Sequence, residues 1–341
     1  MGLPAEAKLT PRAAARVARE TAVQKFDLAA RALSIDWGFT VYGRQTQRWA
    51  QALGGTLVQQ RDREVQAYRR GVRPSGPAND PALLVIGLDG GRVQGKDPDA
   101  ESGSRWREDK VATLTTYLPG DGKDRDAEPL VSSTVATMQD AAAFGPMVRV
   151  EAERRGVRQA AQLLALCDGG NWIDPLLERH FGALVRIIDW CHASEHLWDC
   201  AKAAYGTGTV VAAQHAERWE AWLWDGKVPR VIAALQEESS RAGTPQAADG
   251  PEHPRRVLAQ NVGYFTRHQE HMRYPEYRAK GWPIGSGVTE AAVKQFNKRV
   301  KGTEQFWHES GVEPILMLRA AWISQDDRWD RYWANRPAYC S

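Results

Sequence analysis

The sequence predicts a mixed α/β fold in which helices pack on a sheet, and three observations lead to this prediction. Short apolar runs rich in Val, Ile and Leu have the length and composition of buried strands. Helical segments separate these runs, as the crossovers between parallel strands of one sheet require. A long helical and polar stretch then precedes a final group of helices. With 341 residues and 43 % apolar side chains, the chain can build one large domain or two modest domains around a core.

Residues 1–78 are expected to form a helical region. Thr10 is a favourable N-cap and Pro11 suits the first position of a helix, so a first helix begins there. The segment "FDLAARAL" predicts a short second helix. A third is expected to end at Gly54-Gly55, because glycine is common just beyond helix ends.

The third of these helices has the position of a recognition helix in a helix-turn-helix unit. It carries Arg44, Gln45 and Arg48, side chains that can contact DNA. A helical packing unit with a solvated charged face has about the same weight at this point. A charged helix and a linker rich in Pro, Gly and Asn, over residues 72–81, connect this region to the rest of the chain.

Residues 79–200 are predicted to build the first part of the α/β core. The runs "ALLVIGLDGGRV", "SRWREDKVATLTTYL", "QAAQLLALCDGGNWI" and "ALVRIIDWCH" predict its strands. A helix is expected over about residues 133–155, and others at "DPLLERHF" and "ASEHLWDCAKAAYG". A helical insertion over residues 201–268 follows, then the last part of the core over 269–325 and a tail over 326–341.

Two aspartates stand at equivalent places in this pattern. Asp89 and Asp168 each end an apolar strand and each precede Gly-Gly. Ligand sites of open α/β sheets gather at the carboxyl ends of strands, and glycine lets a substrate approach the backbone closely. A single Asp-Gly pair commonly marks only a turn, but two in the same context favour a shared site. Glu290, in the predicted helix of "PIGSGVTEAAVKQFNKRVKG", is the candidate third carboxylate.

Three carboxylates from two strands and a helix can hold two divalent cations, which clamp an in-line displacement at phosphorus. Clustered carboxylates repel one another unless a cation is present. Mg²⁺, for which Mn²⁺ can substitute, takes oxygen ligands. Basic side chains that can meet phosphates follow Glu290, and the alternative for them is a solvated helix face. They are Lys294, Lys298, Arg299 and Lys301.

The segments "GLDGGRV", "RWREDKVAT", "LCDGGNWI", "IIDWCHASEHLW" and "PIGSGVTEAAVKQFNKRVKG", in this order, resemble those of a DDE insertion-sequence transposase of the ISKra type. The likeness spans residues 83–302, and the helical region before it also fits. The resemblance implies an RNase H-like catalytic core interrupted by a helical insertion, with Asp89, Asp168 and Glu290 as the metal-binding catalytic triad. It further implies DNA strand cleavage and strand transfer at insertion-sequence ends, by a homo-oligomer that holds double-stranded element ends and target DNA.

A second hypothesis is a truncated or domesticated copy that binds DNA without cutting it. Such transposases often carry a longer N-terminal region that includes cysteines, whereas this chain starts close to its helix-turn-helix-like segment. The intact triad favours the enzyme over this alternative.

The stretch "DWCHASEHLWDC", which begins at Asp189, raises a third hypothesis, a zinc metallopeptidase. Its "HASEH" matches the H-x-x-E-H pattern, in which His192 and His196 share one zinc and Glu195 acts as base. Against it, His192 is expected at the end of a buried strand rather than inside a helix, and the Asp-Gly-Gly motifs would have no role. We therefore expect these four residues, which are Asp189, His192, Glu195 and His196, to position the metal-binding carboxylates or to contact DNA. Asp189 is also a lower-ranked alternative to Asp168 as a metal ligand.

Charge and composition narrow the setting. A net charge of +3 neither requires nor excludes a nucleic acid. No apolar run approaches the length of a membrane helix, so no membrane partner is expected. The four cysteines form no C-x-x-C pair and the first 30 residues lack the apolar core of a signal peptide. These features predict a reduced, cytoplasmic protein, associated with the nucleoid if it acts on DNA.

Overall fold

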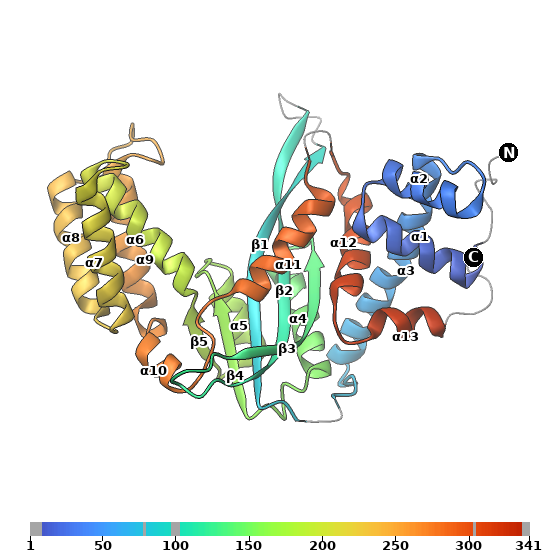
Figure 1. Cartoon of the computed structure of the whole chain (residues 1–341), viewed down its shortest axis with the longest axis horizontal. Helices are drawn as coiled ribbons and strands as arrows, with labels where there is room; N and C mark the ends of the chain where they lie inside the picture. Colours follow the sequence, from blue (N-terminus) through green and yellow to red (C-terminus); the bar gives the residue numbers. More distant parts are fainter. Residues whose placement is uncertain (1–8, 78–79, 97–102, 303–304, 336–341) are drawn as a thin grey trace.

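A five-stranded mixed sheet lies at the centre of the computed structural model, which describes residues 9–77, 80–96, 103–302 and 305–335 (Figure 1). The strands are β1 (Leu83–Lys96), β2 (Ser104–Leu118), β3 (Glu128–Thr137), β4 (Gln162–Cys167) and β5 (Val185–Ile188). Their order across the sheet is β3-β2-β1-β4-β5. β2 is antiparallel to both β1 and β3, whereas β1, β4 and β5 run parallel. The predicted α/β class is confirmed, and the sheet is compatible with an RNase H-like fold.

The predicted helix over residues 133–155 is wrong in its first part. The chain forms β3 there and begins α4 (Ala141–Arg154) only after it. The segment "EPLVSSTVAT" is rich in Val and Thr, which favour strands, and it pairs with β2 along its length. Asp140 then begins α4 as its N-cap, because its carboxylate accepts a hydrogen bond from the Ala143 backbone N–H at 2.9 Å.

Helices cover both faces of the sheet. On one face, α4 and α5 (Ile173–Phe181) pack over apolar side chains of β1 and β2. On the other face, α11 (Gly287–Val300) crosses β1 and β2 (Figure 1). There Phe296 packs with Val93 and Val111 of the sheet. Side chains of β1 pack against the helices on both faces of the sheet, because successive residues of a strand point to opposite faces.

A helical unit stands beside the sheet. It contains α1 (Pro11–Val23), α2 (Phe26–Trp37), α3 (Gly43–Arg69), α12 (Glu309–Ile323) and α13 (Arg328–Ala334). The N-cap prediction is confirmed, since the Thr10 hydroxyl accepts a hydrogen bond from the Ala13 N–H at 3.3 Å. The predicted end at Gly54-Gly55 is wrong, because α3 continues through these glycines. A Cβ at Gly54 would collide with the Pro314 carbonyl, so Gly54 serves the close packing of α3 on α12.

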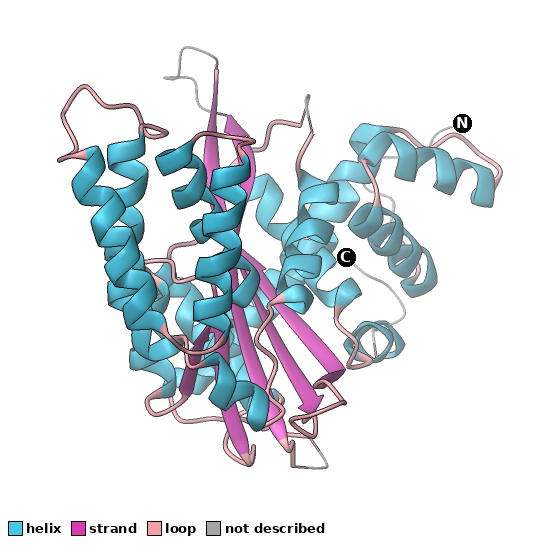
Figure 2. Ribbon diagram, turned by 60° about the vertical axis from the view of Figure 1, so that its left-hand side comes forward, coloured by secondary structure: helices cyan, strands magenta, loops and turns pink. Residues whose placement is uncertain are grey.

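A second group of helices stands at the other end of the molecule (Figures 1 and 2). It contains α6 (Trp190–Tyr205), α7 (Val210–Trp224), α8 (Val228–Ala242) and α9 (Pro254–His268), and the chain returns to the core through η1 (Gln269–His271) and α10 (Tyr274–Ala279). We call α6 to α9 the bundle. Trp219 lies in its core with 1 % of its surface exposed. α6 crosses the predicted insertion start at residue 201 without a break.

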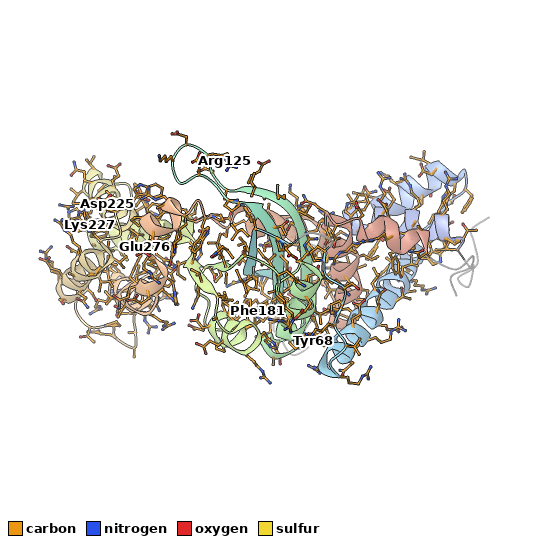
Figure 3. All side chains as sticks on the ribbon, turned by 90° about the horizontal axis from the view of Figure 1, so that it is seen from below. Tyr68, Arg125, Phe181, Asp225, Lys227 and Glu276 are labelled. Carbon is orange, nitrogen blue, oxygen red and sulfur yellow. The ribbon has the colours of Figure 1, made fainter. Side chains whose placement is uncertain are left out.

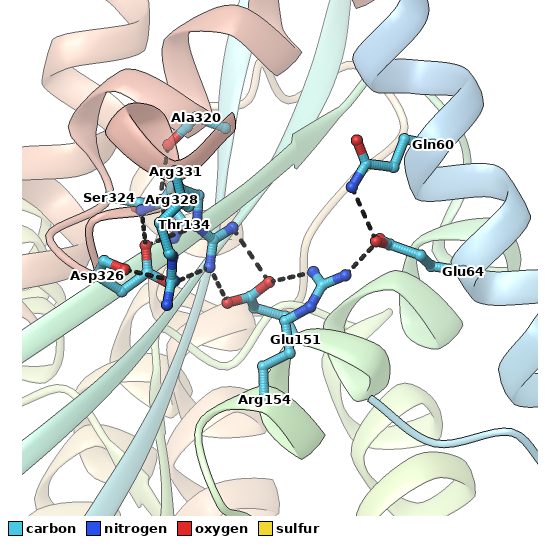
Figure 4. Close-up of polar contacts among 10 residues, drawn as sticks. All are labelled: Gln60, Glu64, Thr134, Glu151, Arg154, Ala320, Ser324, Asp326, Arg328 and Arg331. Carbon is cyan, nitrogen blue, oxygen red and sulfur yellow. Dashed lines mark hydrogen bonds and ion pairs between the residues drawn. The ribbon is translucent and has the colours of Figure 1, made fainter. Parts of the chain in front are cut away.

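Buried charges join the N-terminal helices to the sheet layer. Figure 4 shows Glu151 of α4 between Arg328 of α13 and Arg154, which reaches on to Glu64 of α3. Asp326 also accepts a hydrogen bond from Arg328 at 2.6 Å. Burial alone would raise the pKa of Glu151, but Arg328 and Arg154 outweigh it and lower that pKa to about 2. The network therefore holds Glu151 ionised inside the protein.

The loop between β2 and β3 lies against the turn before α11. The Gly120 N–H donates a hydrogen bond to the Gly281 carbonyl at 2.8 Å. In the view from below, Arg125 stands at the outer end of this loop, on the opposite side of the sheet from Phe181 (Figure 3). A backbone hydrogen bond thus holds the loop between β2 and β3 to the turn that leads into α11.

Candidate active site

Three elements bring Asp89, Asp168 and Glu290 to one cavity. The parallel register pairs Leu88 of β1 with Cys167 of β4, so the next residues, Asp89 and Asp168, stand beside each other. The prediction that Asp89 ends its strand is wrong, because β1 continues to Lys96 through its pairing with β2, whereas Asp168 directly follows the end of β4. Glu290 approaches from the first turn of α11. The cavity has a volume of about 230 Å³, and its other lining residues are Leu88, Cys167, Asp189, Cys191, His192, Glu195 and Ser286. The sequence-predicted triad thus lines one cavity.

The pKa of Asp89 is raised in the folded protein. Burial raises its pKa to about 6, and the charges of Asp168 and Glu290 act in the same direction. A hydrogen bond from the Gly90 N–H, at 2.6 Å, partly opposes this rise. The ionised form of Asp89 is therefore costly in this place, and a bound cation would remove that cost.

Asp168 is held by its own loop and by the bundle. Its carboxylate accepts a hydrogen bond from the Gly170 N–H at 2.9 Å. The Tyr264 hydroxyl of α9 donates to the Asp168 carbonyl, also at 2.9 Å. Gly169 has φ +94°, and a Cβ there would press on His268 and Tyr264. Glycine at this position therefore provides both the turn and the close contact with α9.

Glu290 is placed by the contact between α11 and β1. Its neighbour Thr289 lies over Gly87, where a Cβ would collide with the Thr289 hydroxyl. The same hydroxyl shares a hydrogen bond of 2.8 Å with Thr113 of β2. Glu290 itself pairs with Lys294 one turn later, with 2.9 Å between Oε2 and Nζ. Gly87 thus sets how closely the amino end of α11 approaches the sheet.

Asp189 links the amino ends of two helices. It is 2 % exposed, and one carboxylate oxygen accepts the His192 N–H at 2.7 Å as the N-cap of α6. The other oxygen accepts the Ser286 N–H immediately before α11. A negative charge at two helix amino ends is favourable. Because both of its oxygens are occupied in this way, Asp189 fits a supporting role better than that of an alternative ligand.

The H-x-x-E-H pattern lies on a helix, which corrects the expectation that His192 ends a strand. β5 stops at Ile188, so His192 stands in the first turn of α6 and His196 one turn further. Their ring centroids are 5.1 Å apart, and His196 stacks on Tyr264 at 4.2 Å. His192 Nδ1 lies 3.7 Å from the largely exposed Glu195. The strand was overestimated because the apolar run continues past the point where Asp189 starts the helix.

Carboxylate oxygens are the donors that Mg²⁺ and Mn²⁺ take, so the chemistry of the triad fits these ions. In the part of the chain that the structure describes, no three His, Cys, Asp or Glu side chains are grouped closely enough to ligate one ion. Glu290 is turned toward Lys294, and Asp168 toward its own loop. Ligation by the triad would therefore need rotation of these two side chains. The same finding leaves the H-x-x-E-H pattern without a third zinc ligand among the described residues.

Sequence reasoning missed Asp109 of β2. Asp109 pairs with Gly91 across the hairpin, and a Cβ on Gly91 would press on its carboxylate. It is fully buried, and among the described residues no other residue donates a hydrogen bond to either of its oxygens. Burial raises its pKa to about 6, with further increases from Glu108 and Asp89. The signal in the sequence is weak, because only the strand register shows that Asp109 and Asp89 share a face.

The basic residues of α11 that were predicted to meet DNA separate into two groups. Lys294, Lys298 and Lys301 are exposed. Arg299, by contrast, is 1 % exposed, and its Nε donates to the Thr21 carbonyl of α1 at 2.6 Å. Burial lowers the pKa of Arg299 to about 9. The expectation of phosphate contact does not suit Arg299, which joins α11 to the N-terminal helices.

The three residues predicted to contact DNA from the N-terminal region lie in the first turns of α3. Arg44 and Arg48 are exposed there, and Gln45 is half-buried. Arg44 and Arg48 are four residues apart, so both guanidinium groups lie on one side of the helix. α3 is far longer than the helix that the sequence predicted.

Comparisons with known proteins give little. No protein-family model matches the chain, and no curated protein is similar to it. Among solved structures, the chain is similar to the Drosophila P element transposase strand transfer complex, with 10 % identity, a TM-score of 0.37 and 92 % of each chain covered. No helix in the described ranges combines the length and apolar character needed to cross a bilayer. The function proposed below therefore rests on the geometry of the site.

Proposed function

We propose that this chain is a DDE transposase, a metal-dependent enzyme that cuts DNA strands and transfers them at insertion-sequence ends. The observation that carries the proposal is the meeting of Asp89 of β1 and Asp168, just beyond the end of the adjacent β4, with Glu290 of α11 in one cavity. Two parallel strands and a crossing helix supply carboxylates to a single cavity. Such a set suits divalent cations and phosphoryl transfer better than it suits a structural role.

In this proposal, Asp89, Asp168 and Glu290 hold Mg²⁺, or Mn²⁺ in its place. When bound, the cations make the attacking oxygen more nucleophilic and stabilise the leaving oxygen. The chain's own residues orient the ligands: Asp189 holds the first turn of α11, and Tyr264 holds the Asp168 backbone. Lys294 keeps a positive charge beside Glu290, where a phosphate would lie.

Double-stranded DNA, as element ends and as target, is the proposed substrate. Lys294, Lys298 and Lys301 provide positive charges along α11, beginning at the triad. Arg44 and Arg48 on α3 provide a second basic site, in the helical unit beside the sheet. Holding two element ends at once requires a homo-oligomer, which is part of the proposal.

The test is a cleavage assay of the full-length chain on the DNA that flanks its own gene. Reactions with Mg²⁺, with Mn²⁺ and with EDTA are expected to show metal-dependent cuts at discrete positions. Asp168→Asn is expected to lose at least about a hundredfold in rate while keeping DNA affinity, because it removes one ligand charge. Asp199→Asn is the matched control, since Asp199 is an exposed carboxylate of α6 paired with Lys202 at 3.0 Å.

The other outcomes separate the alternatives. Cleavage that persists in Asp168→Asn contradicts the proposed triad. DNA binding by the unaltered protein with no cleavage under any metal condition favours the non-catalytic DNA-binding protein. Stoichiometric zinc that is lost in His192→Ala, together with peptidase activity, favours the zinc hydrolase.

A further inference from the structure

A strip of basic side chains leads away from the triad along α11. Lys294, Lys298 and Lys301 follow Glu290 at spacings of four, four and three residues, and all three are exposed. Lys294 and Lys298 lie on one face of α11, and Lys301 is the first residue beyond its end. The Lys301 ammonium ends this series 5.4 Å from the centre of the Trp106 ring. The strip therefore connects the candidate active site to an aromatic side chain on β2.

Trp106 is unusual among the tryptophans of the described chain because 46 % of its surface is exposed. It lies opposite Gln94 of β1, near the outer part of the hairpin. A depression of about 560 Å³ surrounds it, lined also by Gly95, Lys96, Arg105, Arg107 and Glu108. Of these cations, Arg107 is paired with Glu309 at 2.6 Å. An apolar ring thus stands open to solvent among positive charges, where it adds little to a core.

Two independent lengths place Trp106 at the same distance from the triad. Along α11, eleven residues separate Glu290 from Lys301, which corresponds to about 16 Å at roughly 1.5 Å per residue. Along β1, five residues separate Asp89 from Gln94, the partner of Trp106, which corresponds to about 17 Å at roughly 3.3 Å per residue. A DNA strand rises about 3.4 Å per nucleotide. Trp106 is therefore about five nucleotides from the phosphate that would meet the triad.

The chemistry of the strip fits one strand of DNA. Lysines at regular spacing match the regular charge of a phosphate backbone. An exposed aromatic ring beside a cation binds a base by stacking, with little dependence on which base it is. A base inside a duplex is already covered on both faces, so the base that stacks on Trp106 must be unpaired or turned out of the helix.

We propose that Trp106 and Lys301 form a stacking platform for an unpaired base, about five nucleotides from the cleaved phosphate of the strand that lies along α11. This proposal rests on the proposed function, because the cleaved phosphate defines the position. The platform holds the strand in register while Lys294 and Lys298 contact its phosphates. Binding there tolerates any base and favours DNA whose end is frayed or single-stranded.

The experiment uses the full-length chain, EDTA to prevent cleavage, and a duplex with a single-stranded extension. Fluorescence anisotropy measures its affinity, and 2-aminopurine placed at successive positions of the extension reports stacking by loss of fluorescence. Trp106→Ala is expected to weaken binding about tenfold and to restore the fluorescence at one position. Trp106→Phe is expected to retain most of both effects, since it keeps a ring.

Two variants serve as controls. Trp224→Ala removes another partly exposed tryptophan, which stacks on Arg278 at 3.7 Å rather than on a lysine of the strip, and it is expected to leave both readouts unchanged. Lys298→Ala is expected to lower the salt dependence of binding by about one unit of slope. Trp106→Ala is expected to leave this slope unchanged, because stacking releases no counterion.

The outcomes distinguish this proposal from the function on which it rests. Wild-type affinity in Trp106→Ala, or an equal loss in Trp106→Phe, overturns the platform. A chain that binds no DNA overturns both proposals. Quenching that depends on Trp106, in a protein that never cleaves DNA, supports the platform as a binding site and contradicts the proposed chemistry. Where cleavage occurs, quenching far from five nucleotides away overturns the assigned register.

Discussion

Asp109 makes the stability of the fold depend on pH. Its pKa is raised by burial from 3.8 to about 6, so the folded chain binds a proton more tightly than the unfolded chain. The stabilisation is complete below about pH 4 and is lost as the pH rises through about 6. Asp109→Asn removes this dependence of the stability on pH. We expect the variant to match the wild type near pH 4 and to exceed it near pH 8 by on the order of 2 kcal/mol in the free energy of unfolding.

Urea unfolding at a series of pH values between 4 and 8 measures this difference. The pKa of Asp89 is also raised, so the wild type and Asp109→Asn both keep part of the pH dependence. Only the difference between their free energies of unfolding reports Asp109. The matched control is Asp124→Asn in the exposed loop between β2 and β3. Parallel curves for Asp109→Asn and the wild type would show that Asp109 is not strained in the folded protein.

The candidate triad could be proposed from the sequence because two of its members carry a local signal. Asp89 and Asp168 follow apolar runs and precede Gly-Gly, and these signals survive without knowledge of the fold. Asp109 carries no such signal, since its proximity to Asp89 depends on the register of the hairpin. Arg299 shows the opposite error: a basic residue in a basic run is buried because α1 packs on that side of α11. Helical spacing alone could not show which side α1 covers.

At the scale of elements, α9 of the bundle positions a residue of the site. We expect Tyr264→Phe to raise the Mg²⁺ concentration needed for half-maximal cleavage several-fold, because the Asp168 backbone loses the hydrogen bond that fixes it. The maximal rate at saturating Mg²⁺ is expected to change less. Titration of the cleavage rate with Mg²⁺ measures both quantities.

Tyr277→Phe is the matched control for this prediction. Tyr277 of α10 also donates to a strand carbonyl, that of Arg186, but at 3.4 Å and away from the triad. Thermal unfolding of both variants shows whether either loses stability. If Tyr264→Phe loses stability but keeps its wild-type response to Mg²⁺, α9 acts only in packing.

The errors at the level of elements share one physical cause. Residues 133–137 of β3 were expected to be helical, α3 was expected to stop at Gly54, and His192 was expected at the end of a strand. In each case a tertiary contact decides: pairing with β2, packing on Pro314, and the capping of α6 by Asp189. The strands β1, β2, β4 and β5 were predicted because their apolar runs require burial wherever they lie.

At the scale of the whole molecule, Glu151 and its arginines attach the N-terminal helices to the sheet layer (Figure 4). We expect Arg328→Met to destabilise the fold by about 3 kcal/mol, because it leaves a buried carboxylate with one partner fewer. The pKa of Glu151 lies below its ordinary 4.5, so its stabilising effect is present above about pH 4.5 and is lost as the pH falls toward 2.

Chemical unfolding at pH 7 measures the effect of Arg328→Met. Arg331→Met is the control: Arg331 is exposed and its side chain donates to the Asp326 carbonyl at 2.7 Å, so its loss is expected to cost at most about 1 kcal/mol. Equal effects of the two variants would mean that the buried network contributes no more than a surface contact.

The two backbone hydrogen bonds accepted by Asp189 also have a mechanical meaning. One carboxylate holds the first turn of α6, which is part of the bundle, and the residue at the start of α11, which carries Glu290. The two helices thus share a pivot. A force on the bundle, such as the pull of a strand gripped there, would act on α11 through this pivot and turn Glu290 with respect to the aspartates of the sheet. Asp189 would then transmit a movement of the bundle to the triad, through the two hydrogen bonds that it accepts.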